Sequence, residues 1–379
     1  MVISQQALPL QGIAVEDAPF LSDQLITYIG NKRALLPQIE STVIQVERKI
    51  GRKLKVLDAF AGSGVVSRML KSHSLHIVSN DIEDYARVLG DCYLTDRTWV
   101  PWTRLAEKID EFNRLADAGV TCNGFIERLY APRDDDNIGP AERVFYTRDN
   151  ARRLDLFAQL ISEASDDLRP FLLGPLLSAA SVHANTAGVF KGFYKDRGSG
   201  IGRFGGSGQD ALFRIKGQIR LRLPVTSRFS SKVTVLQGDA NDLPDRTNGH
   251  DLVYLDPPYN QHPYGSNYFM LNLLVNYVEP KAISEVSGIP VDWRRSGYNV
   301  KKTSLVLLGN LVRRIDTRYL LISFNDEGFI SPTEMTNLLE GIGQVTEMKY
   351  EYNTFRGSRN LRERSSHVTE HLYLVQREG

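Results

Sequence analysis

The segment KVLDAFAGSGVVSRMLK, residues 55–71, constrains the fold of this chain more than any other stretch. A short apolar run ends in an acid, a turn with Gly62 and Gly64 follows, and a helix-like pattern comes next. The following segment, LHIVSNDIEDYARVL, repeats this order, with an apolar run that ends at Asp81. Strand–helix–strand units of this kind build parallel sheets with right-handed crossovers. The sequence therefore predicts an α/β fold around a parallel sheet.

Strand signals occur in two blocks that are separated by a long segment of different character. After the first block, strand-like runs resume in KVTVLQGDA, DLVYLDPPY, RYLLISFND and EHLYLVQRE. Between the blocks the pattern is mostly helical and rich in charge. We therefore expect one sheet domain made of residues 25–93 and 229–379, interrupted by an inserted, mostly helical region at residues 94–228. Ahead of the first strand, apolar residues at intervals of three and four predict an amphipathic helix over Tyr28–Ile50.

Composition and apolar patterning argue against several classes of protein. Lys and Arg total 46 and Asp and Glu total 45, so the net charge of +1 does not indicate a nucleic-acid partner. The first residues lack the features of a signal peptide, and the longest apolar stretch, PFLLGPLLSAASVHA from Pro170, is too short to span a bilayer. Cys92 and Cys122 fit neither a disulfide framework nor a zinc site. We expect a soluble, cytoplasmic protein with no membrane segment.

The glycine turn and the acid that follows it are typical of a nucleotide-binding edge of a sheet. Glycine lets the backbone approach a ligand closely, and an acid about twenty residues after Gly62, here Asp81, can accept hydrogen bonds from ribose hydroxyls. The turn lacks the third glycine that is expected for a dinucleotide. With Asp58 and Phe60 beside it, the turn favours a nucleoside without a diphosphate, such as S-adenosylmethionine. A tight turn in an ordinary α/β protein is the alternative.

The segment DLVYLDPPYN, residues 251–260, reads as a buried strand that ends in an acid, two prolines and a tyrosine. Open α/β sheets bind their ligands at such strand ends, and the two prolines make the backbone there rigid. Pro257 and Pro258 fix the backbone and offer no N–H, so the Asp256 carboxylate and the Pro257 carbonyl form a rigid pair of acceptors. Two such acceptors suit an aromatic amine such as N6 of adenine, whose lone pair they would direct at a methyl group. Tyr259 would stack on a base that has left its helix. A plain loop start is the alternative.

With these two motifs, the chain resembles the N6-adenine DNA methyltransferases of the Dam-type group, the D12 class. TYIGNKRALLPQI is similar to the opening motif of that group, LDAFAGSG to its cofactor loop, and QGDA to the motif ahead of its catalytic strand. NTAGVFKGFYK, DPPYNQHPYGSNYFMLN and FRGSRNLRERSSHVTEHLYLV further resemble methylases of type IIS restriction systems, such as the FokI methylase. The resemblance implies a Rossmann-like, S-adenosylmethionine-dependent methyltransferase sheet, with a target-recognition region inserted between its cofactor half and its catalytic half.

The resemblance also implies roles for individual residues. The amine site would consist of Asp256, Pro257, Pro258 and Tyr259. The cofactor site would consist of Tyr28, Gly30, Lys32, Asp58, Phe60, Gly62, Asp81, Asp239 and Asp256. Asp81 would hold the ribose, Asp239 would read the adenine amino group, and Lys32 would lie near the cofactor carboxylate or the catalytic acid. Asn31 stands where the family's opening motif often has a second glycine before the lysine.

A glycine-rich segment, Lys191–Arg228, combines dense positive charge with aromatic residues and is the candidate DNA-binding surface. Its candidate phosphate contacts are Lys191, Lys195, Arg197 and Arg203, and a second basic run near the end of the chain adds Arg356 and Arg359. A solvated basic loop is the alternative. After the catalytic motif, Asn267 and Tyr268 could contact the flipped base or simply begin a helix.

The main hypothesis is an enzyme that transfers a methyl group from S-adenosylmethionine to adenine N6 at specific sites in double-stranded DNA. It predicts DNA and a cognate restriction endonuclease as partners, and it requires no metal. N4-cytosine methylation is the nearest competing hypothesis, although those enzymes usually carry serine at the position of Asp256. RNA adenine methylation and protein glutamine methylation rely on the same chemistry, and a DNA-binding module without catalysis is a hypothesis from a different class.

Overall fold

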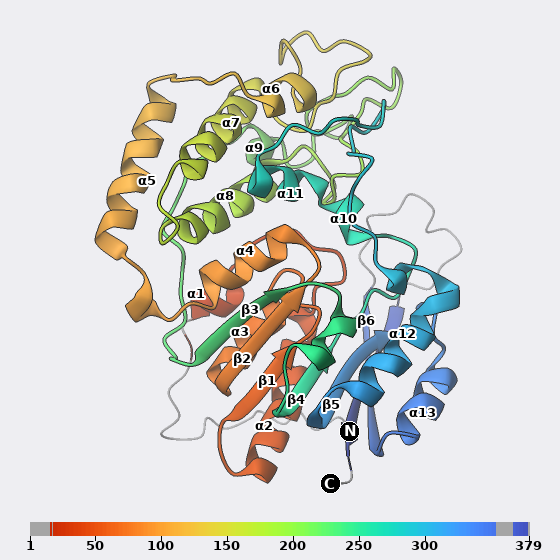
Figure 1. The fold of residues 1–379 in the computed structure, drawn as a ribbon. Helices are drawn as coiled ribbons and strands as arrows, with labels where there is room; N and C mark the ends of the chain where they lie inside the picture. Colours follow the sequence, from red (N-terminus) through yellow and green to blue (C-terminus); the bar gives the residue numbers. More distant parts are fainter. Residues whose placement is uncertain (1–15, 17, 354–366, 378–379) are drawn as a thin grey trace, which may run out of the picture.

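The computed structural model describes residue 16, residues 18–353 and residues 367–377. Seven strands form one sheet in the order β3-β2-β1-β4-β5-β7-β6 (Figure 1). Neighbouring strands are parallel, except that β7 runs antiparallel to both β5 and β6. The strands are β1 Leu54–Asp58, β2 Ser74–Asp81, β3 Lys232–Gln237, β4 His250–Leu255, β5 Thr317–Asn325, β6 Gln344–Asn353 and β7 His367–Gln376. The prediction of an α/β fold with a Rossmann-like sheet is confirmed.

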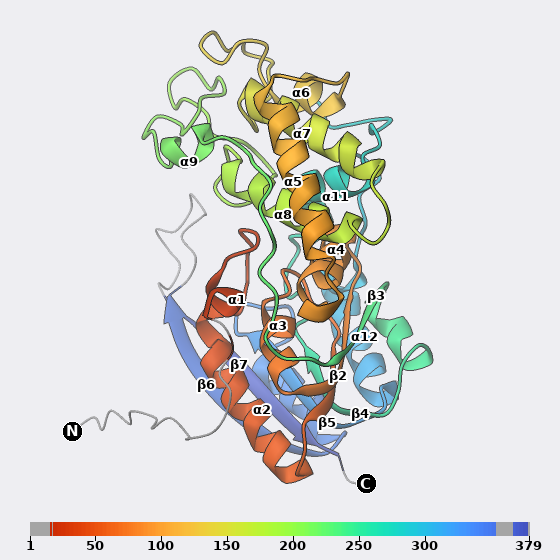
Figure 2. The ribbon, with the colours of Figure 1, turned by 90° about the vertical axis from the view of Figure 1, so that its left-hand side faces the viewer.

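Helices cover both faces of the sheet. On one face, α2 and α3 enclose a core that includes Val56 and Leu252, and on the other, α12 and α13 enclose Leu57 and Val253. Neighbouring residues of a strand therefore point into opposite cores, as the two-residue period of a strand requires. Figure 2 shows α2 on the near side of the sheet and α12 on the far side. These helices are α2 Leu36–Ile50, α3 Val65–Ser72, α12 Lys301–Arg314 and α13 Pro332–Glu340.

The carboxyl ends of β1 and β4 meet where the strand order reverses. From β1 the chain proceeds outward to β2 and β3, and it later returns to the other side of β1 with β4. Asp58, the last residue of β1, pairs with Tyr254 near the end of β4. The glycine turn after β1 and the Asp-Pro-Pro-Tyr segment after β4 therefore leave the sheet side by side. Open α/β sheets bind their ligands at such a switch point.

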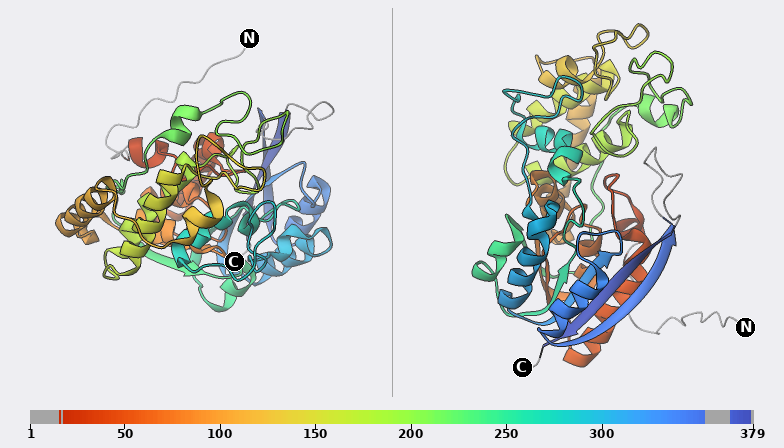
Figure 3. Two further views of the ribbon diagram at one scale, coloured as in Figure 1. Left: turned by 90° about the horizontal axis from the view of Figure 1, so that it is seen from above. Right: turned by 90° about the vertical axis from the view of Figure 1, so that its right-hand side faces the viewer.

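Between α4 and β3 the chain leaves the sheet and builds a helical region above it (Figures 1 and 3). After α4 (Asp84–Tyr93), the helices of this region are α5 Trp102–Asp117, α6 Phe125–Tyr130, α7 Arg148–Ser162, α8 Arg169–His183 and α9 Leu212–Lys216. Leu105 and Phe157 of this region share one buried cluster with Tyr85 of α4 and with Met270 of α11 (Phe269–Asn276). The inserted region is thus anchored on two helices that belong to the predicted sheet domain.

The apolar stretch that begins at Pro170 forms α8, whose leucines lie in the core of the inserted region. Its burial there accounts for the apolar run that is too short to span a bilayer. Across the ranges that the structure describes, no helix combines the length and the apolar character that a membrane crossing requires. Cys92 and Cys122 are both free thiols.

The prediction of one helix over Tyr28–Ile50 was wrong at its start. The helix α2 begins at Leu36, after a short 3-10 turn. The residues before it form a loop in which Gly30 has a φ of +71°, a left-handed conformation that ends any helical run. The backbone N–H of Ile29 donates to the Tyr268 hydroxyl at 2.7 Å, so a tertiary hydrogen bond holds this loop.

The sequence analysis predicted no strand at β6. Its sequence, QVTEMKYEYN, alternates apolar and polar residues over part of its length, and β6 lies at the edge of the sheet beside β7. Such a pattern is typical of a strand with one face covered and the other exposed. The alternation was therefore a usable signal for this strand.

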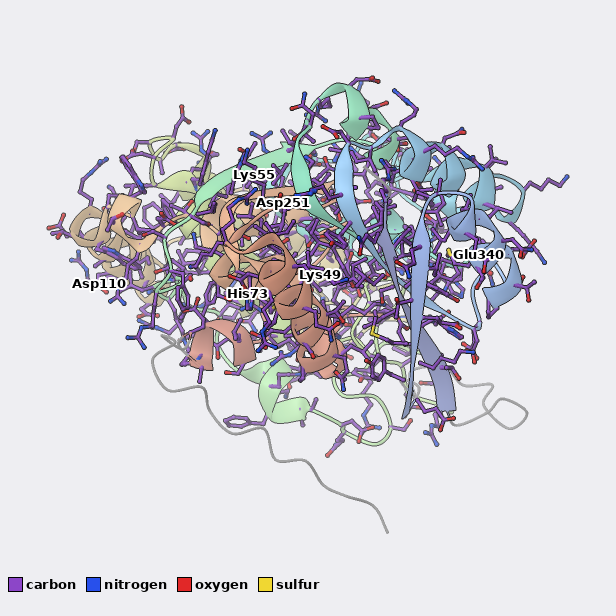
Figure 4. The ribbon with its side chains drawn as sticks, turned by 90° about the horizontal axis from the view of Figure 1, so that it is seen from below. Lys49, Lys55, His73, Asp110, Asp251 and Glu340 are labelled. Atoms are coloured by element: carbon purple, nitrogen blue, oxygen red, sulfur yellow. The ribbon has the colours of Figure 1, made fainter. Side chains whose placement is uncertain are left out.

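Hydrogen bonds close the amino end of β4. Asp251 accepts two hydrogen bonds from the Arg52 guanidinium, at 2.6 and 3.0 Å, and one from the backbone N–H of Lys55 at 2.8 Å. Figure 4, seen from below, labels Asp251 beside Lys55 at this edge of the sheet. The arrangement ties the start of β4 to the start of β1.

Candidate active site

A cleft lies at the carboxyl ends of β1, β2 and β4, and about 840 Å³ of unfilled space lies within it and in the open solvent at its mouth. All nine residues that were predicted to bind the cofactor line it: Tyr28, Gly30, Lys32, Asp58, Phe60, Gly62, Asp81, Asp239 and Asp256. They come from both strand blocks of the sequence. The fold therefore brings the two halves of the predicted site together in one place.

The glycine turn forms one wall of this cleft. The backbone N–H of Gly62 donates to Asp81 Oδ2 at 2.8 Å, and the N–H of Glu83 donates to Asp81 Oδ1 at 2.9 Å. Gly62 has a φ of +53°, and a Cβ atom there would lie 2.8 Å from the ring of Tyr28. Glycine is thus required both by the backbone conformation and by the close approach of Tyr28. Asp81 fixes the turn in addition to lining the cleft.

Two further carboxylates, those of Asp58 and Asp239, line the cleft. Asp58 is buried and accepts a hydrogen bond from Ser67 Oγ at 2.6 Å. Burial raises the pKa of Asp58 to about 7, although the Ser67 hydrogen bond lowers it. Asp239 caps the short helix that follows β3 by accepting from the backbone N–H of Asn241 at 2.9 Å. Both therefore have structural partners of their own in addition to any ligand.

The cleft residues that the sequence analysis did not predict include Glu83, Arg294 and Tyr298. Tyr298 packs edge-on against Phe60 with ring centroids 5.2 Å apart. Glu83 is buried, and burial raises its pKa to about 7. Arg294 pairs with Asp84 at 2.9 Å. Arg294 lies in an irregular segment after α11, and Tyr298 lies in a short 3-10 helix, Gly297–Asn299. Neither stretch carries a motif, so no sequence signal marked these residues.

The Asp256 carboxylate is held by a buried lysine. Lys32 Nζ lies 3.0 Å from Asp256 Oδ1 and 3.0 Å from Glu370 Oε1. The Asp256 side chain is 18% exposed, whereas those of Lys32 and Glu370 are 3% and 0% exposed, so only Asp256 of the three presents a carboxylate to the cleft. Of the two positions predicted for Lys32, the structure shows the one beside Asp256, the predicted catalytic acid.

Burial and charge act in opposite directions on this cluster. Burial raises the pKa of Asp256 to about 6, the charge of Lys32 opposes that rise, and the charge of Glu370 adds to it. For Lys32, burial favours the neutral amine, but the two carboxylates outweigh it and raise the pKa of the ammonium well above its usual value. Lys32 is therefore a fixed positive charge, and Asp256 is a carboxylate that ionises close to neutral pH.

Glu370 was not predicted as a site residue. It lies in β7, and Ser323 Oγ of β5 donates a hydrogen bond to its Oε1. Val368, Leu372 and Leu374 share its face of the strand and are buried. An acid at an inward position of an otherwise apolar strand was the signal that could have identified it.

The Pro-Pro-Tyr part of the motif only partly lines the cleft. Pro258 lines it, whereas Pro257 and Tyr259 lie beside it. Tyr259 packs edge-on against Phe324, with ring centroids 6.2 Å apart. A Cβ atom at Gly30 would lie 2.8 Å from the Tyr259 hydroxyl oxygen, so the glycine lets the loop before α2 lie against this ring. The residues predicted to form the amine site therefore stay together, in the wall of the cleft or directly beside it.

A stack of tyrosines joins the loop before α2 to the segment after β4. The ring of Tyr28 stacks on Tyr264 at 4.9 Å and on Tyr268 at 4.8 Å between centroids. Asn267 ends α10 (Tyr264–Asn267), Tyr268 directly precedes α11, and both side chains are buried. Of the two interpretations of these residues, the structure agrees with the helix start. A contact of Tyr268 with a flipped base would require its ring to leave the packing under Tyr28.

The candidate DNA contacts of the inserted region lie outside the cleft, on one loop between α8 and α9: Lys191, Lys195, Arg197 and Arg203. Lys195 pairs with Gly202 in a β-bridge, and its Nζ lies 5.3 Å from the ring centroid of Phe193. Arg203 is paired with Asp196 at 3.1 Å, which offsets its charge. The remaining two candidates lie outside the described residues: Arg356 and Arg359.

The cleft is acidic. Carboxylates from five positions line it, against the positive side chains of Lys32 and Arg294: Asp58, Asp81, Glu83, Asp239 and Asp256. Aromatic rings from Tyr28, Phe60 and Tyr298 provide flat apolar walls. Such a site suits a ligand that combines a planar ring system, hydroxyl groups and a positive charge.

Comparison with known proteins agrees with this geometry. Residues 28–337 match the family model of the D12 class N6 adenine-specific DNA methyltransferase. The chain is 28% identical over 364 residues to the type II methyltransferase M.NlaIII of Neisseria lactamica, which spans 93% of this chain and 99% of that protein. It is 28% identical over 360 residues to M.CviAII of Paramecium bursaria Chlorella virus 1, spanning 92% and 98%. With M.FokI of Planomicrobium okeanokoites the identity is 23% over 365 residues, spanning 93% of this chain and 52% of M.FokI.

Proposed function

This chain belongs to the D12 class N6 adenine-specific DNA methyltransferases, and we propose that its cleft binds S-adenosylmethionine while Asp256 and Pro257 receive the target adenine. The reaction is site-specific methylation of adenine in double-stranded DNA. One observation carries the assignment of residues: Asp256 lines the same cleft as the glycine turn of Gly62. A donor bound along that turn would therefore meet an amine bound at Asp256.

The acidic cleft supports the choice of cofactor. S-adenosylmethionine carries its methyl group on a sulfonium, whose leaving group is a neutral thioether, so the transfer needs no metal ion. Asp81, at the end of β2, would accept hydrogen bonds from the ribose hydroxyls, and Asp239 would accept one from the adenine amino group. Tyr28, stacked on Tyr264, closes the cleft over the glycine turn. The excess of carboxylates over cations favours a positively charged ligand.

Asp256 and Pro257 would act on the amine of the target base. The lone pair of adenine N6 is delocalised into the ring, which makes the amine a poor nucleophile. Hydrogen bonds from N6 to the Asp256 carboxylate and the Pro257 carbonyl would move this nitrogen toward tetrahedral geometry and so localise its lone pair. Because the two prolines fix the backbone, these acceptors need little reorganisation during transfer. N6 would form a bond to the methyl carbon as the bond from that carbon to the sulfonium sulfur breaks, and N6 would then give up one proton, for which Asp256 is the adjacent base. Tyr259 stacks on the extruded ring.

The inserted region would bind the DNA. The loop with Lys191, Lys195 and Arg197 carries exposed or half-buried cations above the sheet and provides contacts to phosphates. Lys195→Ala should weaken DNA binding a few-fold at all sequences and reduce its salt dependence by roughly one counterion. Lys108→Ala is the matched control, because Lys108 lies in the same region but pairs with Glu111 on α5. Equal effects of both substitutions would contradict this assignment.

A cognate restriction endonuclease is the second partner that we propose. Several relatives are named as type II methyltransferases or modification methylases, which are the methylating members of restriction systems. Methylation by this chain should then protect plasmid DNA from a restriction enzyme of the same sequence specificity. Digestion of methylated and unmethylated plasmid with a panel of such enzymes tests this.

Transfer of labelled methyl groups from S-adenosylmethionine to unmethylated plasmid tests the proposed function. After digestion to nucleosides, the label should appear in N6-methyl-2′-deoxyadenosine. Label in N4-methylcytosine would keep the mechanism and change the base. Transfer to RNA or protein without transfer to DNA would overturn the assignment of substrate, and cofactor binding without any transfer would indicate a DNA-binding module.

A further inference from the structure

We propose that Glu370 is a positioning residue for methyl transfer, which holds Lys32 against Asp256 and offsets part of the lysine charge that Asp256 experiences. This role rests on the proposed function of Asp256 as the acceptor for the target amine. Glu370 comes from β7, at the far end of the sequence from Lys32. It has no place in the Asp-Pro-Pro-Tyr motif or in the glycine turn.

The ammonium of Lys32 is surrounded by three oxygen acceptors. Asp256 Oδ1 and Glu370 Oε1 each lie 3.0 Å from Nζ, and the carbonyl oxygen of Gly30 lies at 3.4 Å. An ammonium has three N–H donors, so each donor has one acceptor in this arrangement. Lys32 cannot turn toward Asp256 alone without giving up the Glu370 contact. The carboxylate of Glu370 therefore sets the direction of the lysine.

Glu370 is itself held rigidly. In the register of the sheet it lies opposite Asn325 of β5, and Ser323 Oγ donates to its Oε1. Its side chain is fully buried, so neither solvent nor bound DNA can replace it as a partner of Lys32. A hydrophobic residue could fill the same space. Burying an ionised carboxylate this deeply lowers the stability of the fold unless an opposite charge, here that of Lys32, compensates for the lost hydration.

The charge of the cluster explains why a carboxylate lies at this position. With Lys32 alone, Asp256 would form a simple ion pair, and its oxygens would be weaker acceptors for an amine. Glu370 adds a second negative charge, so the three ionised groups sum to one negative charge. The charge of Glu370 raises the pKa of Asp256 against the effect of Lys32. Asp256 is thereby both anchored and left basic enough to bind the N6–H groups.

Other titratable groups also face the cluster, and each could shift its protonation. Asp58 lies at the end of β1, Tyr254 lies in β4, and Tyr259 and Tyr264 follow β4. Burial raises the pKa of all four, so in the neutral range the three tyrosines stay neutral. Asp58 has a pKa of about 7 and titrates close to Asp256. Substitution at Glu370 itself is therefore needed to isolate its effect.

The test is the pH dependence of the single-turnover rate of methyl transfer in Glu370→Gln. Glutamine keeps the size and loses the charge, so the acid limb of the profile should move to lower pH by roughly one unit. The plateau rate should fall roughly ten- to a hundredfold, because Lys32 loses its second anchor. Binding of S-adenosylmethionine should change only a few-fold. An acid limb at the wild-type position would overturn the proposal, even if the rate falls.

Two further variants separate charge from structure. Glu347→Gln removes a carboxylate from the adjoining β6, where Glu347 pairs with His371 outside the cleft, and it should leave the acid limb unchanged. Glu370→Asp keeps the charge, so its acid limb should stay at the wild-type position even where its rate is low. If Glu370→Gln does not fold, Lys32→Gln is compared instead with the double variant that carries both Lys32→Gln and Glu370→Gln. The double variant should be the faster of the two, because Glu370 without Lys32 only repels the Asp256 charge.

The proposed function and this inference can fail separately. Absence of N6-methyl-2′-deoxyadenosine in DNA treated with the wild-type enzyme would contradict the proposed function. Normal wild-type transfer with an unshifted Glu370→Gln profile, or with a double variant slower than Lys32→Gln, would remove only the role of Glu370.

Discussion

Two aspartates of the same chain segment, Asp251 in β4 and Asp256 after it, stand at opposite ends of one strand and have opposite electrostatic environments. Asp251 accepts hydrogen bonds from Arg52 and from the Lys55 backbone, and these hold its pKa below the usual range even though burial opposes them. Burial raises the pKa of Asp256 to about 6, against the opposing charge of Lys32.

The difference shows how a parallel sheet separates stability from function. At the amino end of β4, backbone and side-chain donors satisfy the carboxylate and join two strands. At the carboxyl end, the chain turns away into Pro257 and Pro258, which have no N–H to donate. The carboxylate there keeps acceptor capacity for a ligand. A buried carboxylate whose hydrogen-bonding capacity is not filled lowers the stability of the fold, and such groups with shifted pKa values are concentrated at functional sites.

The largest expected effect is on the rate of methyl transfer. It should follow substitution of Asp256 at the carboxyl end of β4 and not substitution of Asp251 at the amino end. Asp256→Ala should lower the rate of methyl transfer by roughly a thousandfold or more, because the target amine loses its charged acceptor. Affinity for S-adenosylmethionine should stay within a few-fold. Single-turnover transfer and equilibrium binding measure the two quantities.

Asp251→Asn is the matched control for this comparison, since it changes an aspartate five positions earlier. Its rate under conditions where it is folded should equal that of the wild type within a few-fold. Undiminished turnover in Asp256→Ala would remove Asp256 from the mechanism.

The pH profile should show the second largest effect. The pKa of Asp256 is raised from 3.8 to about 6, so a growing fraction of the carboxyl is protonated as the pH falls below 6. A protonated carboxyl accepts the N6–H groups poorly, and the rate should fall about tenfold for each unit of pH below that value. A rate that stays constant from pH 7 down to pH 5 would contradict the role of the ionised carboxylate.

Two glycines test whether the carboxyl end of the sheet is shaped for a ligand. Gly62 and Gly51 both have positive φ, but a Cβ atom would meet the Tyr28 ring only at Gly62, since nothing lies within 4 Å of one at Gly51. Gly62→Ala should weaken S-adenosylmethionine binding by roughly tenfold. Gly51→Ala should lower the free energy of unfolding by about 1 kcal/mol and leave binding unchanged. Equal binding losses would show that the effect is only backbone strain.

The smallest expected effect is on stability, and it should differ between the two aspartates. Asp251→Asn should lower the free energy of unfolding by about 1–2 kcal/mol at pH 8, because Arg52 and the Lys55 N–H lose a charged acceptor. Asp256→Asn should not lower it, since burial disfavours the ionised carboxylate in the folded state. Urea denaturation at pH 8 measures both.

The same substitution pair gives a pH dependence of known sign. The pKa of Asp251 is lowered in the folded state, so its contribution is present above the usual carboxyl pKa and is lost as the pH falls through the folded value. The stability deficit of Asp251→Asn should therefore shrink in acid. A deficit that grows as the pH falls would contradict the hydrogen-bonding account of Asp251.

Local backbone chemistry made much of this protein predictable from its sequence. Neighbouring residues determine the local backbone conformation at three places: the glycine turn, the acid that ends β2 and the Asp-Pro-Pro-Tyr segment. Glycine with positive φ and proline without an N–H act within a few residues, so a sequence alone shows them. Local apolar patterns likewise located every strand of the sheet except β6.

Tertiary structure decided what depends on distant residues meeting. Glu370 reaches Lys32 because β7 inserts between β5 and β6 in antiparallel register, and no local pattern encodes that register. Tyr268 is buried because Tyr28 packs over it, and the helix α2 starts late because the loop before it bonds to that tyrosine. Long-range packing energy overrides local preference at such places, and the charge that tunes Asp256 is one of its results.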